Sequence, residues 1–309
     1  MPKTPEYDFL KSRKYVVKTI KMRGQISQGL VLPLAVLPSG EYEVGDDVTK
    51  ILGVTKYDPE AEQENAVLEE SGIKSKNPII RYFMRFKWFR KIYLKLFISD
   101  DFPNWIKKTD EKRIQNMPNL FRRLKENKTV LSVTEKVDGT SATYFLRRIK
   151  KNKYEFGVCS HSKRVVKEDK LYYWNVARKF KIKDTLKLLI GDLDWIVLQG
   201  EITGEKIQGN KYPMDGGERF WAFNLISPEG KLTTEEMQRT LLHYGIYTVP
   251  IFDDKFVIPE DWEISDLVHY VQGKSQIYPR EREGCVFRNV EQGISFKCIN
   301  PEFLIKNNA

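Results

Sequence analysis

The sequence predicts an α+β protein with more than one domain. Its 309 residues exceed the size of one average domain and are comfortable for two. From residue 103 onward, strand-like runs cluster around a few helical segments, as they do in an α+β domain. Before that point, residues 14–54 alternate apolar and polar positions between glycines, which indicates the short strands of a small β-barrel or its remnant.

Residues 57–102 lie between these two parts and divide by charge. The stretch 57–70 contains six acidic residues and no Lys or Arg, so we interpret it as a linker or a solvated helix. The stretch 74–99 contains eight Lys and Arg and no acidic residue. Aromatic residues at the spacing i, i+4, i+7 and i+11 predict a helix over 78–98 with one aromatic stripe. They are Tyr82, Phe86, Phe89 and Tyr93.

Three interpretations of this basic aromatic helix stay open. It packs against the neighbouring domain, contacts a nucleic-acid backbone, or attaches to an anionic membrane surface. Six charges among its 21 residues argue against a transmembrane span. For nucleic-acid contact, the candidate residues are Arg85, Lys87, Arg90 and Lys91.

The larger domain is expected to begin with a loop and a helix over 113–124, which Thr109 or Asp110 would cap. Two further helices are expected, at 169–182 and 234–243. Alternating or apolar runs predict strands at 129–135, 141–149, 195–201, 219–226, 284–289 and 294–299.

The composition favours a polyanionic partner. Fifty-two Lys and Arg against 42 Asp and Glu give a formal charge of +10. The N-terminal residues contain no apolar core of signal-peptide length, and nowhere do 18 uncharged apolar residues follow one another. Three scattered cysteines without a CxxC pair suit reduced thiols. We therefore expect a soluble cytoplasmic protein that needs neither a membrane nor an obligatory protein partner.

The sharpest local motif is VTEKVDGTSATYFL, which surrounds Lys136. A strand delivers this lysine into a turn formed by Asp138 and Gly139, and the alternation resumes at Ser141. A lysine at such a corner can act as a nucleophile when its surroundings favour the unprotonated amine. The tetrapeptide KxDG alone is only a turn, so the interpretation depends on the segments that follow it.

Four further segments follow in sequence order: LQGEITG with Glu201, RFWAFNLI with Phe223, EGCVFR with Glu283, and SFKCI with Lys297. Each segment is weak when taken alone. Together with KxDG they form the motif series of the covalent nucleotidyltransferases. At these places the chain resembles polynucleotide ligases and mRNA capping enzymes.

Longer segments narrow the resemblance to one group, the ATP-dependent RNA ligases that carry an OB-type domain before the transferase domain. The similar segments are RGQISQGLVLPL, GDDVTKILGVTKY, KTDEKRIQN, LQGEITGEKIQGNKY and SFKCINPEFLIK. DNA ligases and capping enzymes continue into a C-terminal OB domain, whereas this sequence ends twelve residues after Lys297, which favours the RNA ligases.

The resemblance implies a three-step reaction that uses ATP and a divalent metal, Mg²⁺ or Mn²⁺. Lys136 would attack the α-phosphate of ATP to give lysyl-AMP, AMP would pass to an RNA 5′-phosphate, and a 3′-OH would displace it. Lys297 would neutralise the α-phosphate, and Glu201 and Glu283 would hold the ribose or a hydrated metal. The expected partner is RNA, as a nicked duplex or an RNA–DNA hybrid.

The remaining implied residues complete the nucleotide site. Phe223 would stack on adenine, and Glu135 would contribute backbone contacts that distinguish the base. Asp138 and Gly139 would shape the turn and orient the ribose. Lys211, within the similar segment KIQGNKY, would touch phosphate or RNA.

Three regions result from these expectations. They are an OB-type β domain over 1–56, complete or truncated, the acidic linker and basic aromatic helix over 57–102, and an adenylyltransferase domain over 103–309. The last is expected to consist of antiparallel sheets flanked by helices. Two alternatives to an RNA ligase stay open: a non-catalytic nucleic-acid-binding protein on a degenerate transferase fold, and an mRNA guanylyltransferase, which would react with GTP.

Overall fold

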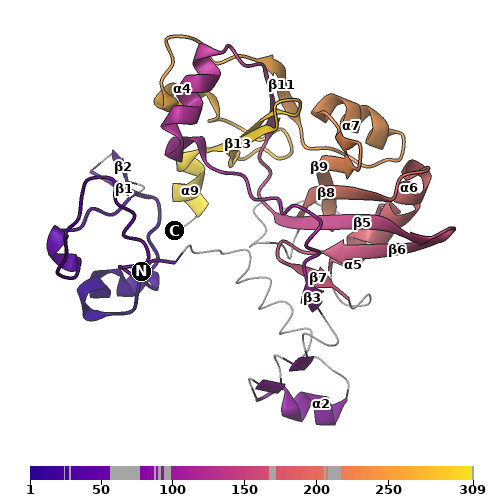
Figure 1. Cartoon of the computed structure of the whole chain (residues 1–309), viewed down its shortest axis with the longest axis horizontal. Coiled ribbons are helices and arrows are strands. Elements are labelled where there is room, and N and C mark those ends of the chain that lie inside the picture. The colour runs from indigo at the N-terminus through magenta and orange to yellow at the C-terminus, as the bar shows by residue number, and fades with distance from the viewer. Residues whose placement is uncertain are drawn as a thin grey trace. The chain divides into compact units, whose positions relative to one another are not determined.

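The computed structural model of the chain shows two compact units (Figure 1). One contains Met1–Pro59 and Pro301–Ala309, and the other contains Glu60–Asn300. The residues that the structure describes are 1–23, 25–27, 29–55, 77–86, 88–89, 92–93, 99–166, 172–204, 207 and 217–307.

The smaller unit has little regular structure in its described part. Strands β1 (Ile20–Met22) and β2 (Gln25–Ser27) form one antiparallel pair. The helical elements are η1 (Pro5–Arg13), η2 (Leu34–Val36) and α9 (Pro301–Asn307). Within these described residues only one hairpin corresponds to the expected barrel strands, so an OB-type domain over 1–56 stays a prediction.

The region 57–102 is described only in part, and its acidic stretch lies outside the described residues. Helix α2 (Pro78–Phe83) begins behind Asn77, whose side-chain oxygen accepts hydrogen bonds from the backbone N–H groups of Ile79 and Ile80 at 2.9 and 3.4 Å. Pro78 suits the first turn, where its missing N–H has no helical partner to lose. A turn at residues 84–86 follows α2, and residues 88, 89, 92 and 93 are again helical, so the described residues interrupt the single helix expected over 78–98.

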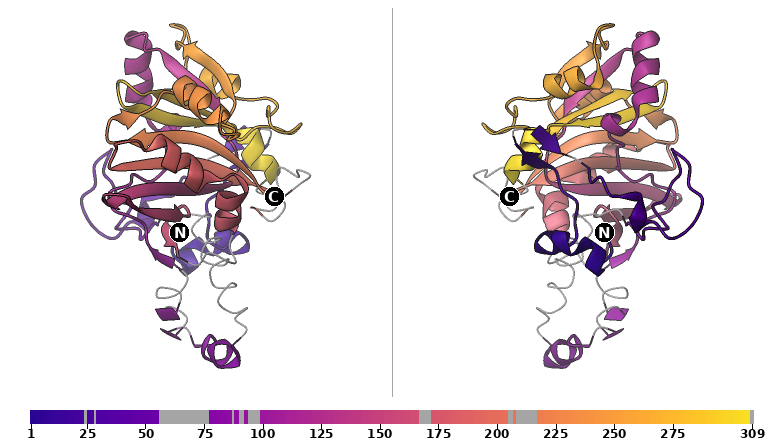
Figure 2. Two further views of the ribbon diagram at one scale, coloured as in Figure 1. Left: turned by 90° about the vertical axis from the view of Figure 1, so that its right-hand side faces the viewer. Right: turned by 90° about the vertical axis from the view of Figure 1, so that its left-hand side faces the viewer.

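The larger unit is built on two antiparallel sheets. A seven-stranded sheet has the order β10-β9-β8-β5-β6-β7-β3, and its strands run side by side in Figure 2. Their bounds are β3 (Ser99–Asp101), β5 (Thr140–Lys150), β6 (Lys153–Cys159), β7 (Lys163–Val165), β8 (Trp195–Thr203), β9 (Arg219–Ser227) and β10 (Gly230–Lys231). A four-stranded sheet has the order β11-β4-β12-β13, with β4 (Leu131–Glu135), β11 (Ile251–Phe256), β12 (Gly284–Asn289) and β13 (Ile294–Ile299).

Helices flank both sheets, which confirms the predicted α+β class. They are η3 (Ile114–Asn116), α4 (Pro118–Glu126), α5 (Tyr172–Lys179), α6 (Ile182–Leu189), α7 (Thr234–Leu242) and α8 (Ile264–Tyr270). The prediction of a single helix over 169–182 is wrong at its C-terminal end. Lys181 adopts a left-handed backbone conformation with φ of 50° and separates α5 from α6. None of the described helices is both long and apolar enough to cross a membrane.

Each sheet has its own apolar core. Against the seven-stranded sheet, Tyr144 of β5, Leu198 of β8 and Tyr173 of α5 are buried in one cluster. Against the four-stranded sheet, Phe287 and Phe296 stack with ring centroids 5.1 Å apart in a second cluster, which also includes buried residues of α4 and α8. The two cores hold the sheets as separate layers, and the chain passes from one to the other between β4 and β5.

Candidate active site

Lys136 lies where the chain leaves the four-stranded sheet. Strand β4 ends at Glu135 and β5 begins at Thr140 in the seven-stranded sheet, so Lys136 is the first residue of a four-residue connection. Its backbone N–H donates to the carbonyl of Gly284 at 3.0 Å, which fixes the lysine against β12. Its Nζ forms an ion pair with Oε2 of Glu283 at 2.6 Å. The predicted nucleophile is thus held by its backbone and its side chain.

Gly139 ends this connection against the backbone near the C-terminal end of β8. A Cβ atom at Gly139 would collide with the carbonyl oxygen of Ile202 and would lie 3.0 Å from Cγ of Glu201. No larger residue fits without displacing the β8 backbone. The glycine therefore brings the lysine-bearing turn directly beside Glu201.

A pocket opens beside this connection and collects five of the predicted residues: Glu135, Lys136, Glu201, Phe223 and Lys297. Its lining comes from both sheets and from the loop that precedes η3. The remaining lining residues are Thr109, Asp110, Glu111, Thr134, Val137, Ser141, His161, Val249, Val286 and Arg288. Segments almost 190 residues apart in the sequence thus form one polar cavity with an aromatic wall.

Lys297, on β13, is the second lysine of the pocket. Val286 is its partner across the β12–β13 ladder, and its N–H donates to the carbonyl of Lys112 at 2.9 Å. Burial, and then the positive charge of Lys136, lower the pKa of the Lys297 amine, while the carboxylate of Glu283 opposes this effect. Because the repulsion between the two amines is mutual, an anion placed between them would be bound favourably.

Glu135 is almost fully buried, with 1% of its surface exposed. Its N–H donates to the carbonyl of Pro250, and its Oε2 accepts a hydrogen bond from the backbone N–H of Gln276, at 2.9 and 2.8 Å. Burial raises the pKa of this carboxyl group, and hydrogen bonds from Ser275 and Gln276 partly offset the increase. Its side chain therefore fastens the loop before β12, and its N–H is already bonded within the protein.

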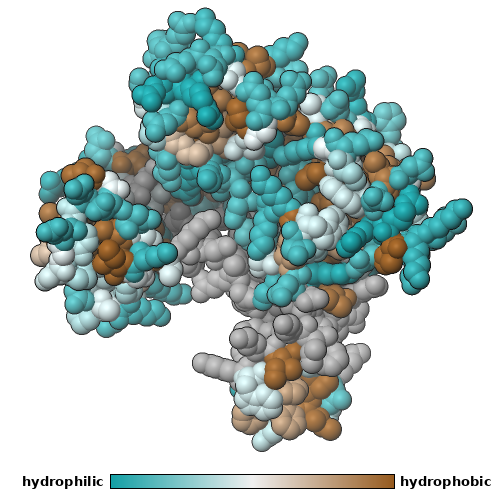
Figure 3. Space-filling model, in the orientation of Figure 1, coloured by the Kyte–Doolittle hydropathy of each residue, from teal (hydrophilic) through white to brown (hydrophobic). Residues whose placement is uncertain are grey.

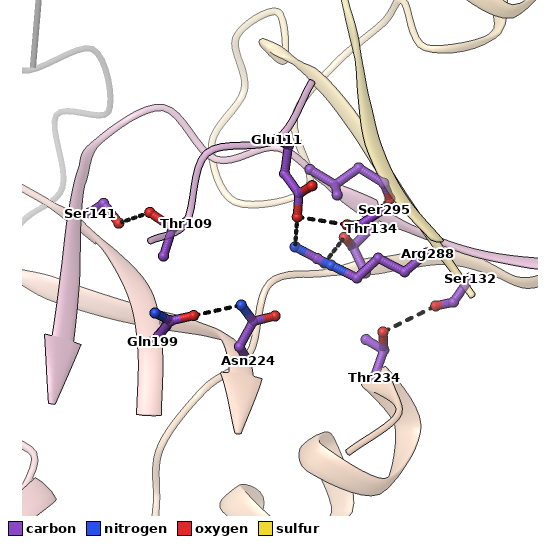
Figure 4. A network of polar contacts seen from close by, with 11 residues as sticks. Thr109, Glu111, Ser132, Thr134, Ser141, Gln199, Asn224, Thr234, Arg288 and Ser295 are labelled. Carbon is purple, nitrogen blue, oxygen red and sulfur yellow. Dashed lines mark hydrogen bonds and ion pairs between the residues drawn. The ribbon is translucent and has the colours of Figure 1, made fainter. Parts of the chain in front are cut away.

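A buried polar network forms another part of the wall (Figure 4). Arg288, at the end of the EGCVFR segment, is 5% exposed, and its guanidinium forms an ion pair with Glu111 at 3.6 Å and a hydrogen bond to Thr134 at 3.3 Å. Ser295 donates to the same Glu111 oxygen at 2.6 Å. The guanidinium carbon also lies 5.9 Å from the ring centroid of Phe223, so the network supports the aromatic residue predicted to stack on a base.

The comparisons with known proteins agree with this geometry. A family model described as RNA ligase matches residues 129–303, which is more than half of the chain. The chain belongs to the RNA ligase family. A search of curated proteins gave no match.

Solved RNA ligase structures support the same assignment. A variant of Naegleria gruberi RNA ligase with ATP and Mn is 28% identical, and the match covers 94% of this chain and 77% of that chain with a TM-score of 0.70. The same ligase with PPi is 29% identical, with 93% and 75% covered and a TM-score of 0.68. Another variant with AMP and Mn is 28% identical, with the same coverage and a TM-score of 0.69.

Several residues that line this pocket were not assigned to it from the sequence. Thr109 and Asp110 were expected to cap a helix, but α4 begins only at Pro118 and the two residues line the pocket instead. Thr109 Oγ1 lies 2.8 Å from Ser141 Oγ, and Asp110 lies 3.4 Å from His161. The sequence feature that could have placed them there is the segment KTDEKRIQN, which resembles RNA ligases but was not assigned to the site.

The donors for a divalent metal fit a hard cation that arrives with a nucleotide. The carboxylates of Glu201, Asp110 and Glu111 line the pocket, and oxygen ligands are what Mg²⁺ and Mn²⁺ prefer. No group of three or more His, Cys, Asp or Glu in the described part of the chain could hold a metal by itself.

The predicted metal ligands differ in their surroundings. Glu201 lies in the pocket wall and is 8% exposed. Glu283 is not among the lining residues, and its Oε2 is paired with the amine of Lys136 at 2.6 Å. Asp138 and Gly139 lie on the connection itself. Of the residues assigned to nucleic acid, only Arg85 is described. Lys87, Arg90, Lys91 and Lys211 lie outside the described residues.

Proposed function

We infer that this protein is an ATP-dependent RNA ligase that joins 3′-OH and 5′-phosphate ends through a lysyl-AMP intermediate on Lys136. The observation that carries the inference is the pocket in which the Lys136 amine, the Lys297 amine, the Glu201 carboxylate and the Phe223 ring meet. The RNA ligases of similar structure contain ATP or AMP with Mn, or PPi.

In the first step, Nζ of Lys136 forms a bond to the α-phosphorus of ATP. The bond from that phosphorus to the bridging oxygen breaks and pyrophosphate leaves with the bonding electrons. The ammonium group loses two of its three protons, and the nitrogen of lysyl-AMP keeps the third. The Glu283 carboxylate, 2.6 Å from Nζ, is within reach to accept one of them. Lys297 stabilises the negative charge that develops on the α-phosphate.

The next two steps transfer and then release AMP. An oxygen of the RNA 5′-phosphate attacks the phosphorus of lysyl-AMP, the P–N bond breaks, and Lys136 regains its amine. The 3′-OH at the opposite side of the nick then attacks the 5′-phosphorus and loses its proton, and AMP leaves as the phosphodiester forms. A bound Mg²⁺ or Mn²⁺ would supply positive charge at the phosphates, and Glu201 and Glu283 are the carboxylates proposed to hold it.

The adenine is assigned to the aromatic end of the pocket. Phe223 offers a ring for stacking, and Val137 and Val249, which form an apolar cluster with it, also line the pocket. Asp138 and Gly139 are proposed to orient the ribose from the connection between the sheets. The RNA substrate is proposed to be a nicked duplex, either of RNA or of an RNA–DNA hybrid, which makes the protein an RNA ligase (ATP).

The decisive experiment follows the covalent intermediate. The purified chain, incubated with a divalent metal and α-labelled ATP, should become labelled, whereas Lys136→Ala should not. Lys153→Ala is a matched control, because Lys153 is an exposed lysine at the start of β6. Label that persists in Lys136→Ala would exclude Lys136 as the nucleophile, and label from GTP instead of ATP would favour a guanylyltransferase.

A second measurement separates a ligase from a binding protein. Sealing of a 3′-OH/5′-phosphate nick is compared with RNA or DNA on either side of the nick. A chain that binds nicked duplex but never forms the AMP adduct would support the non-catalytic alternative.

A further inference from the structure

The segment around α2 carries an aromatic surface that the ligase pocket does not use. Its outward apolar side chains are largely exposed: Tyr82 by 55%, Phe86 by 43% and Trp88 by 61%. Figure 3 shows that hydrophobic residues are also exposed on the α2 segment at the bottom of the view. We call the exposed rings of Tyr82, Phe83, Phe86 and Trp88 the aromatic face.

The aromatic face is not the core side of an ordinary amphipathic helix. Met84 and Tyr93 of the same segment are buried, with 2% and 8% of their surface exposed, so the segment already has an inward side. On a surface helix the opposite side is normally polar. Here the predicted single stripe is split, because Tyr82 and Phe86 are exposed while Tyr93 is buried. Rings that remain exposed after the core is formed indicate a binding surface.

The rings form a connected group with a cation beside it. The centroid of Tyr82 lies 5.6 Å from that of Phe83 and 6.0 Å from that of Phe86. The guanidinium carbon of Arg85 lies 5.8 Å from the Tyr82 centroid. Arg85 belongs to the stretch 74–99, which holds eight Lys and Arg and no acidic residue. Exposed rings beside basic side chains are the combination that binds unpaired nucleotides, through base stacking and phosphate contact.

We propose that the aromatic face binds single-stranded RNA, with unpaired bases stacked on its rings and phosphates on the neighbouring basic residues. The choice of RNA rests on the proposed ligase function and on the charge of the segment, which complements a phosphate backbone. Such a surface would hold an unpaired strand or overhang of the substrate, separately from the paired ends in the pocket. An anionic membrane surface would use the same residue types and is tested as a competing occupant.

The test measures binding of the full chain to a short labelled RNA strand without ATP. It compares this strand with an abasic strand of equal length and charge, because only the first can stack. The variant Tyr82→Ala/Phe86→Ala/Trp88→Ala should bind the base-containing strand at least about tenfold more weakly. Its affinity for the abasic strand should remain that of the wild type, since the basic residues are unchanged.

A matched control replaces three exposed apolar residues elsewhere in the larger unit and should bind both strands like the wild type. These are Leu188, Leu242 and Tyr244. The single variant Trp88→Ala, at an exposed side chain, gives a second reading if the triple variant unfolds at a lower temperature. This single variant should show a smaller difference in affinity between the base-containing and the abasic strand than the wild type does.

Two results would overturn the proposal. One is equal binding of the base-containing strand by the triple variant and the wild type. The other is loss of binding to phosphatidylserine vesicles with RNA binding unchanged, which would assign the aromatic face to a membrane surface. Because this assay uses no ATP, its failure is distinct from failure of the ligase proposal, which would be a wild-type chain that takes no label from ATP.

Discussion

Replacement of Gly139 by alanine tests whether the turn after Lys136 sets the geometry of the site. The added Cβ would collide with the Ile202 carbonyl oxygen and would lie 3.0 Å from Cγ of Glu201, where ordinary contacts begin at 3.4 Å. The turn and β8 would have to separate by about 1 Å, and overpacking of this kind costs roughly 1–3 kcal/mol of unfolding free energy. At about 2–4 °C per kcal/mol, the thermal midpoint should fall by several degrees.

The same displacement should affect catalysis more than stability. A misplacement of about 1 Å between a nucleophile and its substrate can cost roughly a hundredfold in rate. We therefore expect Gly139→Ala to incorporate α-labelled AMP about a hundredfold more slowly while it remains folded. The assay is the initial rate of labelling at a temperature well below the midpoint, beside a thermal unfolding curve.

Gly29→Ala is the control, because a Cβ at Gly29 meets nothing within 4 Å. It should leave both the unfolding curve and the labelling rate unchanged. A Gly139→Ala variant that unfolds at the wild-type temperature and labels at the wild-type rate would refute the reasoning, since it would show that the turn and β8 do not meet as described.

Three further predictions concern charged residues. Replacing four basic residues by Gln should reduce the dependence of RNA affinity on salt, by about 0.7 in the log–log slope for each phosphate that is no longer neutralised, and an unchanged slope would exclude a role of these residues in phosphate binding. The four are Arg85, Lys87, Arg90 and Lys91. Glu111→Gln leaves Arg288 as a buried cation without its ion-pair partner and should lower the unfolding free energy in urea by roughly 3–5 kcal/mol, whereas a decrease below about 1 kcal/mol would contradict the buried pair. Burial, and then the charge of Arg288, lower the pKa of Lys231 to about 8, so the folded state loses this proton before the unfolded state and wild-type stability should rise between about pH 8 and 10.5. Lys231→Met should lack this rise. If the free energy of unfolding of the two proteins changes with pH in parallel, the assigned role of Lys231 is wrong.

The strands that carry the motifs were well predicted from the sequence. β4, β5, β8, β9, β12 and β13 lie close to their expected positions, because buried strands leave long apolar or alternating runs. β6, β7 and β11 were missed, since their residues are partly exposed and mixed in character. The break between α5 and α6 was also missed, because a left-handed lysine such as Lys181 leaves no sequence signal.

The pocket was predicted only where a motif marks it. Lys136, Glu201, Phe223 and Lys297 line one pocket, and each belongs to one of the segments recognised in the sequence. Glu111 and Arg288 were not assigned to the site, because their pairing joins positions 177 residues apart and nothing in either local sequence announces it. Their contact is a product of the tertiary fold, and single-sequence patterns report mainly local structure.

The passage of the chain between the two sheets has a thermodynamic consequence. Lys136, Glu283 and Lys297 are carried by the four-stranded sheet or its edge, while Glu201 and Phe223 are carried by the seven-stranded sheet. A nucleotide that contacts both groups of residues would link two sheets that each have a core of their own. Its binding free energy would be added to the cohesion between the layers, so ATP should make the two halves of the larger unit melt together at a higher temperature.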